Sequence, residues 1–243
     1  MRQLSAGAFM TRVFLAFFLF SLLFSFPAAA QDVAEMCDMF ADVPVTITPT
    51  IEEASFDYST SIGGLKALEA STPHFYERLL LGVTTYKPEI SINSAPESIT
   101  LSDGSHCIKI ASIEIKLTYK DVVVHVANEI PQGSCGFNEV VAHEQKHVNT
   151  NQQVVLDYIP VMQDKLHDYL KAAGRVHDPD YGHAMTVIHD KTKSYVQELL
   201  RSLAQEDQTR QQQIDSNDEF QQMARSCNGQ LGQIAAQFRR TGM

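Results

Sequence analysis

The sequence has few basic residues and no stretch that gathers them. Its 243 residues include 19 Lys and Arg against 29 Asp and Glu, which gives a net charge of −10. A basic face is the electrostatic footprint of a nucleic-acid-binding protein, so we expect no nucleic-acid partner. A Gly-rich phosphate loop and a Gly-x-Ser-x-Gly turn are also missing. The 44% hydrophobic residues, with 12 Gly and 9 Pro, exclude a collagen-like or broadly disordered chain.

The sequence contains one long apolar run, and it lies near the N-terminus. Arg2 and Arg12 precede the apolar residues 13–26, and Pro27 and three alanines follow them. This order is typical of a secretory signal peptide over residues 1–30, cleaved after Ala30. We therefore expect an exported protein, either periplasmic or secreted, that is not an integral membrane protein after cleavage.

Two β-rich segments in the middle of the chain predict a hairpin. Residues 108–119 alternate isoleucine and leucine with smaller or polar residues, and residues 122–130 are rich in valine. Lys120 and Asp121 between them are typical of a tight turn.

The four cysteines of an exported chain are expected to form disulfides. Three pairings of Cys37, Cys107, Cys135 and Cys227 are possible. Counting outward from the predicted turn brings Cys107 beside Cys135, close enough for a cross-strand bridge. The expected pairs are therefore Cys107–Cys135 and, as the remainder, Cys37–Cys227.

The hydrophobic period changes after residue 135, which predicts an α+β fold. Residues 31–135 form an N-terminal part with short strands at 45–51, 54–60 and 79–86 and a short helix at 64–70. Residues 136–243 form a helical part that we expect to belong to the same domain. The fold we expect is a small antiparallel sheet, with its β-hairpin, packed on a long C-terminal helical hairpin.

The first long helix is predicted from a repeat of seven residues. Val141, Val148, Val155, Met162 and Tyr169 follow this spacing, which places them on one helical face. The helix should begin near residue 138, bend at residue 160, where there is a proline, and end at residue 174, a glycine. A second helix follows, and residues 216–219 form a capping box that opens a third.

The first helix carries an HExxH motif, which predicts one zinc ion per chain. His143 and His147 are one turn apart on the same helical face, as two ligands of a tetrahedral zinc should be. Glu144 is rotated by about 100° from His143, so its carboxylate can accept a proton from water without binding the metal. We therefore expect Glu144 to be catalytic.

The third zinc ligand is expected on the second helix. Gln153 stands where a metzincin-like motif has its third histidine. If the two long helices are antiparallel, the histidines downstream lie near the far turn, whereas Glu206, Asp207 and Asp215 come near the motif. Glu206 lies on the apolar stripe of its helix, and Asp215 lies just before the third helix. Both remain candidates for the third ligand.

Several segments resemble a bacterial family of predicted secreted zinc-dependent proteases. The resemblance runs from about residue 56 to residue 220. It includes Phe-Asp-Tyr-Ser-Thr at 56–60, Gly-Val-Thr-Thr-Tyr at 82–86, the motif at 143–147 and Gln-Ile-Asp at 213–215. Of the family's stretch around Asp215 only this aspartate carries over, because Ile214, Asn217 and Phe220 stand where the family has Tyr, Glu and His. The resemblance implies a peptidase.

The function we expect is that of an exported zinc metallopeptidase acting on a peptide or protein in the cell envelope or the medium. Residues 122–130 would offer a sheet edge on which a substrate could lie as an extra strand. Two alternatives remain open: a non-catalytic envelope protein with a binding or structural role, and a zinc amidase acting on cell-wall material.

Overall fold

The computed structural model describes Cys37 and residues 43–69 and 80–241. The chain divides into two compact units, Met1–Phe40 and Ala41–Met243, and the second contains every described strand. The predicted signal peptide lies outside the described residues. No helix in the described part of the chain is both long and apolar enough to span a membrane.

The second unit is an α+β structure, as predicted, whose sheet is organised around one long central strand. This strand, β4 (His106–Val126), pairs along one edge with the antiparallel β3 (Gly82–Thr100). Three short strands follow one another along its other edge. They are β5 (Arg175–Asp178), which is antiparallel, and β1 (Val45–Ile51) and β2 (Ser55–Asp57), which are parallel. The sheet is therefore mixed, whereas the sequence predicted an antiparallel one.

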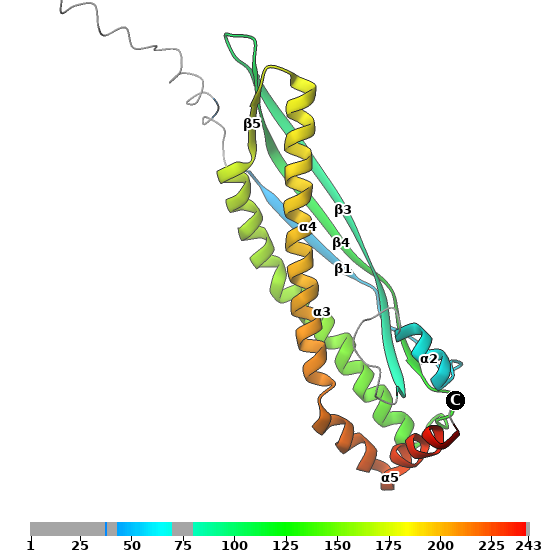
Figure 1. Cartoon of the computed structure of the whole chain (residues 1–243). Coiled ribbons are helices and arrows are strands. Elements are labelled where there is room, and N and C mark those ends of the chain that lie inside the picture. The colour runs from blue at the N-terminus through cyan, green and yellow to red at the C-terminus, as the bar shows by residue number, and fades with distance from the viewer. Residues whose placement is uncertain (1–36, 38–42, 70–79, 242–243) are drawn as a thin grey trace, which may run out of the picture. The chain divides into compact units, whose positions relative to one another are not determined.

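Two long helices form an antiparallel pair that covers one face of the sheet (Figure 1). They are α3 (Cys135–Ala173) and α4 (Tyr181–Ile214), and β5 lies in the connection between them. The short α2 (Ile62–Glu69) and the C-terminal α5 (Asn217–Thr241) lie at the end of the sheet where α3 begins. This end also holds the HExxH motif.

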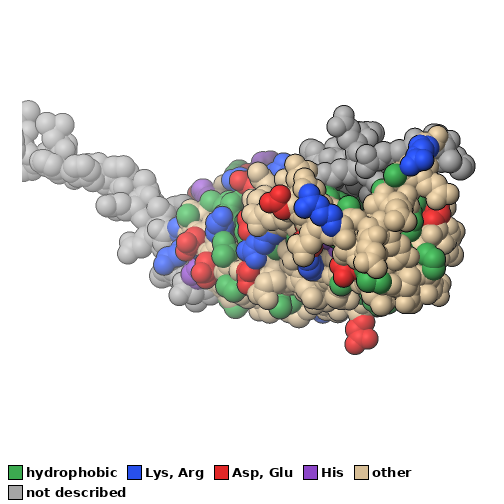
Figure 2. Space-filling view, turned by 90° about the horizontal axis from the view of Figure 1, so that it is seen from below, with side chains coloured by type: hydrophobic (Ala, Val, Ile, Leu, Met, Phe, Trp, Pro, Cys, Tyr) green, Lys and Arg blue, Asp and Glu red, His purple; other side chains and the backbone are tan. Residues whose placement is uncertain are grey.

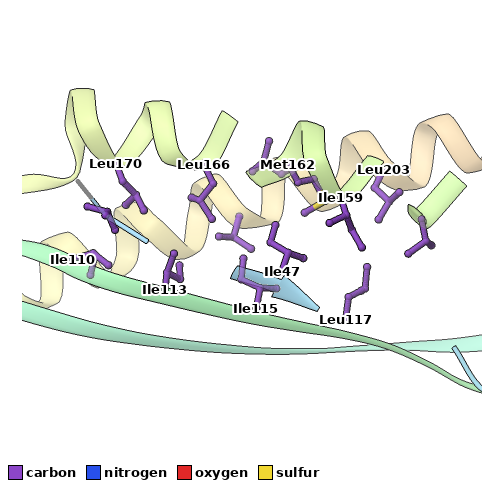
Figure 3. Packing of buried hydrophobic residues seen from close by; sticks show 14 of the residues in the cluster. Ile47, Ile110, Ile113, Ile115, Leu117, Ile159, Met162, Leu166, Leu170 and Leu203 are labelled. Carbon is purple, nitrogen blue, oxygen red and sulfur yellow. The ribbon is translucent and has the colours of Figure 1, made fainter. Parts of the chain in front are cut away.

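The core lies between the helix pair and β4 (Figure 3). Ile113, Ile115 and Leu117 of β4 point toward the helices, where they meet residues such as Met162 and Leu166. Beyond Asp121, the buried residues of β4 are even-numbered: Val122, Val124 and Val126. This shift follows from a β-bulge at Asp121, which has a φ of 50° and lies where the pairing with β3 slips.

The predicted hairpin with a turn at Lys120-Asp121 is wrong, because β4 runs through these residues as one strand. The hairpin turn lies instead at residues 101–105, between β3 and β4. Pro88 and Pro96 concealed the length of β3 in the sequence. Because β3 is paired with a described strand on one edge only, it can include prolines that a central strand would exclude.

The predicted cysteine pairs depended on that hairpin and are also wrong. Cys135 is bonded to Cys227, which joins the first residue of α3 to α5. Cys37 and Cys107 are disulfide-bonded as well, and no described cysteine is free. All four cysteines therefore form disulfides, as predicted, but not in the predicted pairs.

The ends of the long helices follow local capping rules. The Ser134 side chain accepts a hydrogen bond from the Phe137 N–H and begins α3 three residues earlier than predicted, and Gly174 ends it. Pro160 lies inside α3 without ending it. Ser216 accepts from the Glu219 N–H, as the capping box predicted, but the Glu219 side chain extends toward α3 instead.

Candidate metal centre

At the end of the α3–α4 pair that carries the HExxH motif, three pairs of polar side chains face each other across the two helices like the rungs of a ladder. His143 lies opposite Asp215, His147 opposite Gln211, and Asn151 opposite Asp207. Each step of four residues forward on α3 is matched by four residues backward on α4, because the helices are antiparallel with about 3.6 residues per turn. We call these six residues the polar ladder.

Three ligand atoms, from His143, His147 and Asp215, meet between the first and second steps of the ladder. The Nε2 atoms of His143 and His147 are 3.2 Å apart. Asp215 Oδ1 lies 3.3 Å from the first of these nitrogens and 3.2 Å from the second. The three atoms form a nearly equilateral triangle. The His143 side chain is 6% exposed, that of His147 14% and that of Asp215 20%.

This triangle fits one face of a tetrahedral zinc site. Zinc binds imidazole nitrogen at about 2.0–2.1 Å and carboxylate oxygen at about 2.0–2.2 Å, so two tetrahedral ligands lie about 3.3–3.5 Å apart. The donor set, two imidazoles and one carboxylate, is one that zinc enzymes use, and it leaves a fourth position open. His143, Glu144 and His147 also form a group that could hold a metal ion, with ligand atoms within 4.8 Å of one another.

Glu144 is buried beside the triangle and held by the first residues of β3. Thr84 Oγ1 donates a hydrogen bond of 2.9 Å to Glu144 Oε2. Gly82 packs directly against the same side chain: a Cβ at this position would lie 2.7 Å from Glu144 Oε1 and 2.8 Å from Val140 Cγ1. A glycine is therefore needed here for the strand to approach the helix so closely.

The ionisable groups of the site change one another's pKa values. Burial lowers the pKa of His147, but its hydrogen bond to Asp215 and the charges of Glu144 and Asp215 raise it to about 9. Burial would raise the pKa of Asp215, yet the hydrogen bonds to His143 and His147 hold it well below its usual range. Burial raises the pKa of Glu144 despite the charges of His147 and His143. The site therefore collects negative charge that attracts protons or a cation.

A further carboxylate lies on the other side of His143. Glu219 Oε1 is 3.7 Å from His143 Nδ1 and also pairs with Lys146. His143 Nδ1 is buried and has no hydrogen-bond partner among the described residues. The contact with Lys146 is the main reason why the pKa of Glu219 is lowered.

The second step of the ladder determines which nitrogen of His147 is protonated. His147 Nδ1 lies 2.5 Å from Gln211 Oε1, and an amide oxygen can only accept, so Nδ1 carries the proton. The Gln211 amide nitrogen donates to Asp207 Oδ1 over 3.0 Å and to the His147 carbonyl over 3.2 Å. Asp207 is buried and also accepts from Tyr86 and Asn151.

Of the two candidates for the third ligand, the structure places Asp215 at the histidines and Glu206 away from them. The Glu206 carboxylate accepts from Arg210 Nε over 2.8 Å and is 42% exposed. Four histidines, His167, His177, His183 and His189, lie toward the other end of the helix pair, as predicted. Asp207 lies near the motif, as predicted, and contacts Tyr86 and Asn151. Gln211 and Tyr86 were not predicted as site residues, although the spacing of Asp207, Gln211 and Asp215 by fours marks one polar helical face.

The surface at this end carries charges of both signs. Figure 2 shows Lys and Arg side chains interspersed with Asp and Glu side chains on the face that it presents. No single-sign patch therefore dominates the described part of this face.

Comparisons with known proteins identified no relative of this chain. No protein family model, no curated protein and no solved structure matches the chain. The resemblance to secreted zinc-dependent proteases therefore stays a prediction, and a function can be inferred only from the geometry of the site.

Proposed function

We propose that this chain is an exported zinc-dependent metallopeptidase with His143, His147 and Asp215 as its metal ligands. The observation that carries the proposal is the triangle of two imidazole nitrogens and one carboxylate oxygen, with sides of 3.2–3.3 Å. A buried carboxylate, that of Glu144, lies beside it.

Glu144 has the position of a general base in such a site. Zinc bound at the triangle would act as a Lewis acid and acidify a water molecule at the open position. The Glu144 carboxylate would accept the proton of that water and later deliver it to the leaving nitrogen. The hydrogen bond from Thr84 and the packing of Gly82 fix the direction in which this carboxylate points.

A strand beside the site has an edge without a partner among the described residues, which suggests that the substrate is a peptide. The predicted docking strand, 122–130, is wrong for this role, because β3 and β2 pair with β4 on both sides there. The edge strand beside Glu144 is β3, which pairs with no described strand other than β4. An extended peptide could add to this edge through main-chain hydrogen bonds and pass the metal centre.

Export is supported by the disulfides. Such bonds persist in the periplasm and outside the cell, whereas reducing systems in the cytosol break them. A signal peptide at residues 1–30 would direct the chain there.

Metal content and one conservative substitution test the function. We expect about one zinc per purified chain, lost in His147→Ala and kept in His167→Ala, which changes a histidine of the same helix outside the ladder. Glu144→Gln should keep zinc but lower the hydrolysis of a peptide library by about 10²–10⁴, the usual cost of losing a general base. The exposed Glu139, also on α3, provides the matched control Glu139→Gln.

Three outcomes would contradict the proposal. A wild-type chain that binds no zinc would remove the metal centre. Zinc binding without any hydrolysis of the library would favour a non-catalytic zinc protein. Equal hydrolysis by wild type and Glu144→Gln would show that the site does not act through this carboxylate.

A further inference from the structure

The buried carboxylate of Asp207 has no place in the chemistry described above, although it is connected to the metal centre. It is 6% exposed and lies two turns of α4 before Asp215. A buried charge is costly unless donors surround it. Here Tyr86 Oη donates over 2.6 Å and Asn151 Nδ2 over 3.1 Å to Oδ2, and Gln211 Nε2 donates over 3.0 Å to Oδ1.

These contacts make Asp207 the group that orients the Gln211 amide. A carboxylate oxygen accepts hydrogen bonds, so the Gln211 amide must present its nitrogen to Asp207 Oδ1, as the 3.0 Å contact shows. The Gln211 oxygen then faces His147 Nδ1 at 2.5 Å. If the amide were reversed, its oxygen would face the carboxylate and its NH₂ group would face Nδ1, which would favour a proton on the wrong nitrogen.

We propose that Tyr86, Asp207 and Gln211 form a positioning relay that holds His147 with its proton on Nδ1 and its Nε2 lone pair directed at the metal position. The proposal depends on the metal site described above. The relay acts through hydrogen-bond direction: the carboxylate fixes the amide, and the amide fixes the imidazole. Metal-binding histidines generally need such a partner on their other nitrogen.

The position of Tyr86 in the sheet explains how the relay is tied to the rest of the site. Gly82, Thr84 and Tyr86 lie on the same face of β3, because side chains alternate along a strand. The first two contact Glu144, and the third contacts Asp207. One strand segment therefore positions both the general base and the relay.

The test measures the tautomer of His147 in metal-free protein by imidazole ¹⁵N NMR. The measurement is made at an alkaline pH at which the ¹⁵N shifts themselves show this imidazole to be neutral. Tyr86 keeps its proton in this range, because burial and Asp207 raise its pKa. We expect a larger share of the Nδ1–H tautomer in wild type than in Asp207→Asn, because Asp215, which can accept from Nε2, is present in both. Asp157→Asn, an exposed aspartate on α3 that is not part of the relay, is the matched control.

A double substitution separates the relay from a general effect on folding. In Asp207→Asn with Gln211→Glu, the new amide can donate to the new carboxylate, which still accepts from His147 Nδ1. We expect this pair to restore the Nδ1–H tautomer. Zinc affinity, measured against a competing chelator, should fall about 10–100-fold in Asp207→Asn and recover in the pair.

An unchanged tautomer and zinc affinity in Asp207→Asn would overturn the relay, as would a failure of the double variant to restore them. If Asp207→Asn does not fold, Gln211→Met at the half-buried position 211 replaces it, with the same expected decrease in the share of the Nδ1–H tautomer and the same contrary result. If wild type contains no zinc, the proposed function is contradicted but the relay is not, because the tautomer is measured without metal.

Discussion

The two halves of the α3–α4 pair share one register but are built from different interactions. In the half far from α5, residues 155–170 of α3 and 188–203 of α4 bury aliphatic side chains in the main core. In the other half, residues 143–151 face residues 207–215 through the polar ladder. From Asn151 opposite Asp207, each residue forward on α3 is matched by one residue backward on α4. This register places Val155 opposite Leu203 and Leu166 opposite Thr192.

The difference shows how one helix pair can provide both stability and precision. Burial of apolar area is non-directional and tolerates small shifts, so the apolar half can hold the helices in register. Hydrogen bonds weaken steeply with angle, so the polar half depends on that register being kept. If this division is correct, substitutions in the two halves should have different effects.

The largest effect on stability is expected in the apolar half. Leu166 is fully buried, and Leu166→Ala should lower the free energy of unfolding by about 2–5 kcal/mol through lost burial and the cavity left behind. Leu156 on the same helix is 53% exposed, so Leu156→Ala should lower the free energy of unfolding by less than about 0.5 kcal/mol. Urea denaturation of metal-free protein measures both. Equal losses would show that this half does not hold the helices together.

A smaller effect is expected where the two halves meet. Asn151→Leu extends the apolar half by one residue but removes a donor from the buried Asp207, which should cost about 1–3 kcal/mol. Gln153→Leu, at an exposed position on the same helix, is the matched control in the same denaturation experiment. A neutral or stabilising Asn151→Leu would mean that the ladder tolerates apolar residues as the other half does.

No effect on zinc binding is expected from Glu206, which lies next to the ladder without belonging to it. Its carboxylate is exposed and paired with Arg210, so Glu206→Gln should leave the zinc affinity unchanged. Asp215→Asn should weaken zinc binding, because it removes charge from one of the three ligand atoms. Chelator competition measures both. A loss of affinity in Glu206→Gln alone would make Glu206 the third ligand.

The helical part of the fold and two histidines of the site could be predicted because their signals are local. The seven-residue period, the Gly174 cap and the four-residue spacing of His143 and His147 all act within one helix. The choice between Glu206 and Asp215 needed the register of two helices. A count from helix ends at 173 and 182 places residue 208 opposite His147, three residues short of Gln211, because the connection that contains β5 does not bring the two helix ends level.

The sheet could be predicted less well because its pairing depends on distant residues. Asp121 has a conformation that is common in turns, and here it is used in a bulge inside β4. The length of β3 became visible only from its pairing with β4, since two prolines interrupt its pattern. The disulfide between Cys135 and Cys227 depends on where α5 returns to α3, which no local pattern encodes.

The shared register also determines where this chain can gain or lose residues during evolution. The connection around β5 lies at the far end of the helix pair, so a longer loop there would leave the metal centre as it is. One residue inserted between Leu203 and Asp207 would turn the rest of α4 by about 100° and carry Gln211 and Asp215 away from the histidines. An insertion of a whole heptad would nearly restore the face but move it by about 10 Å along the helix. Length variation should therefore be confined to the loops, while the distance in sequence from Leu203 to Asp215 stays constant.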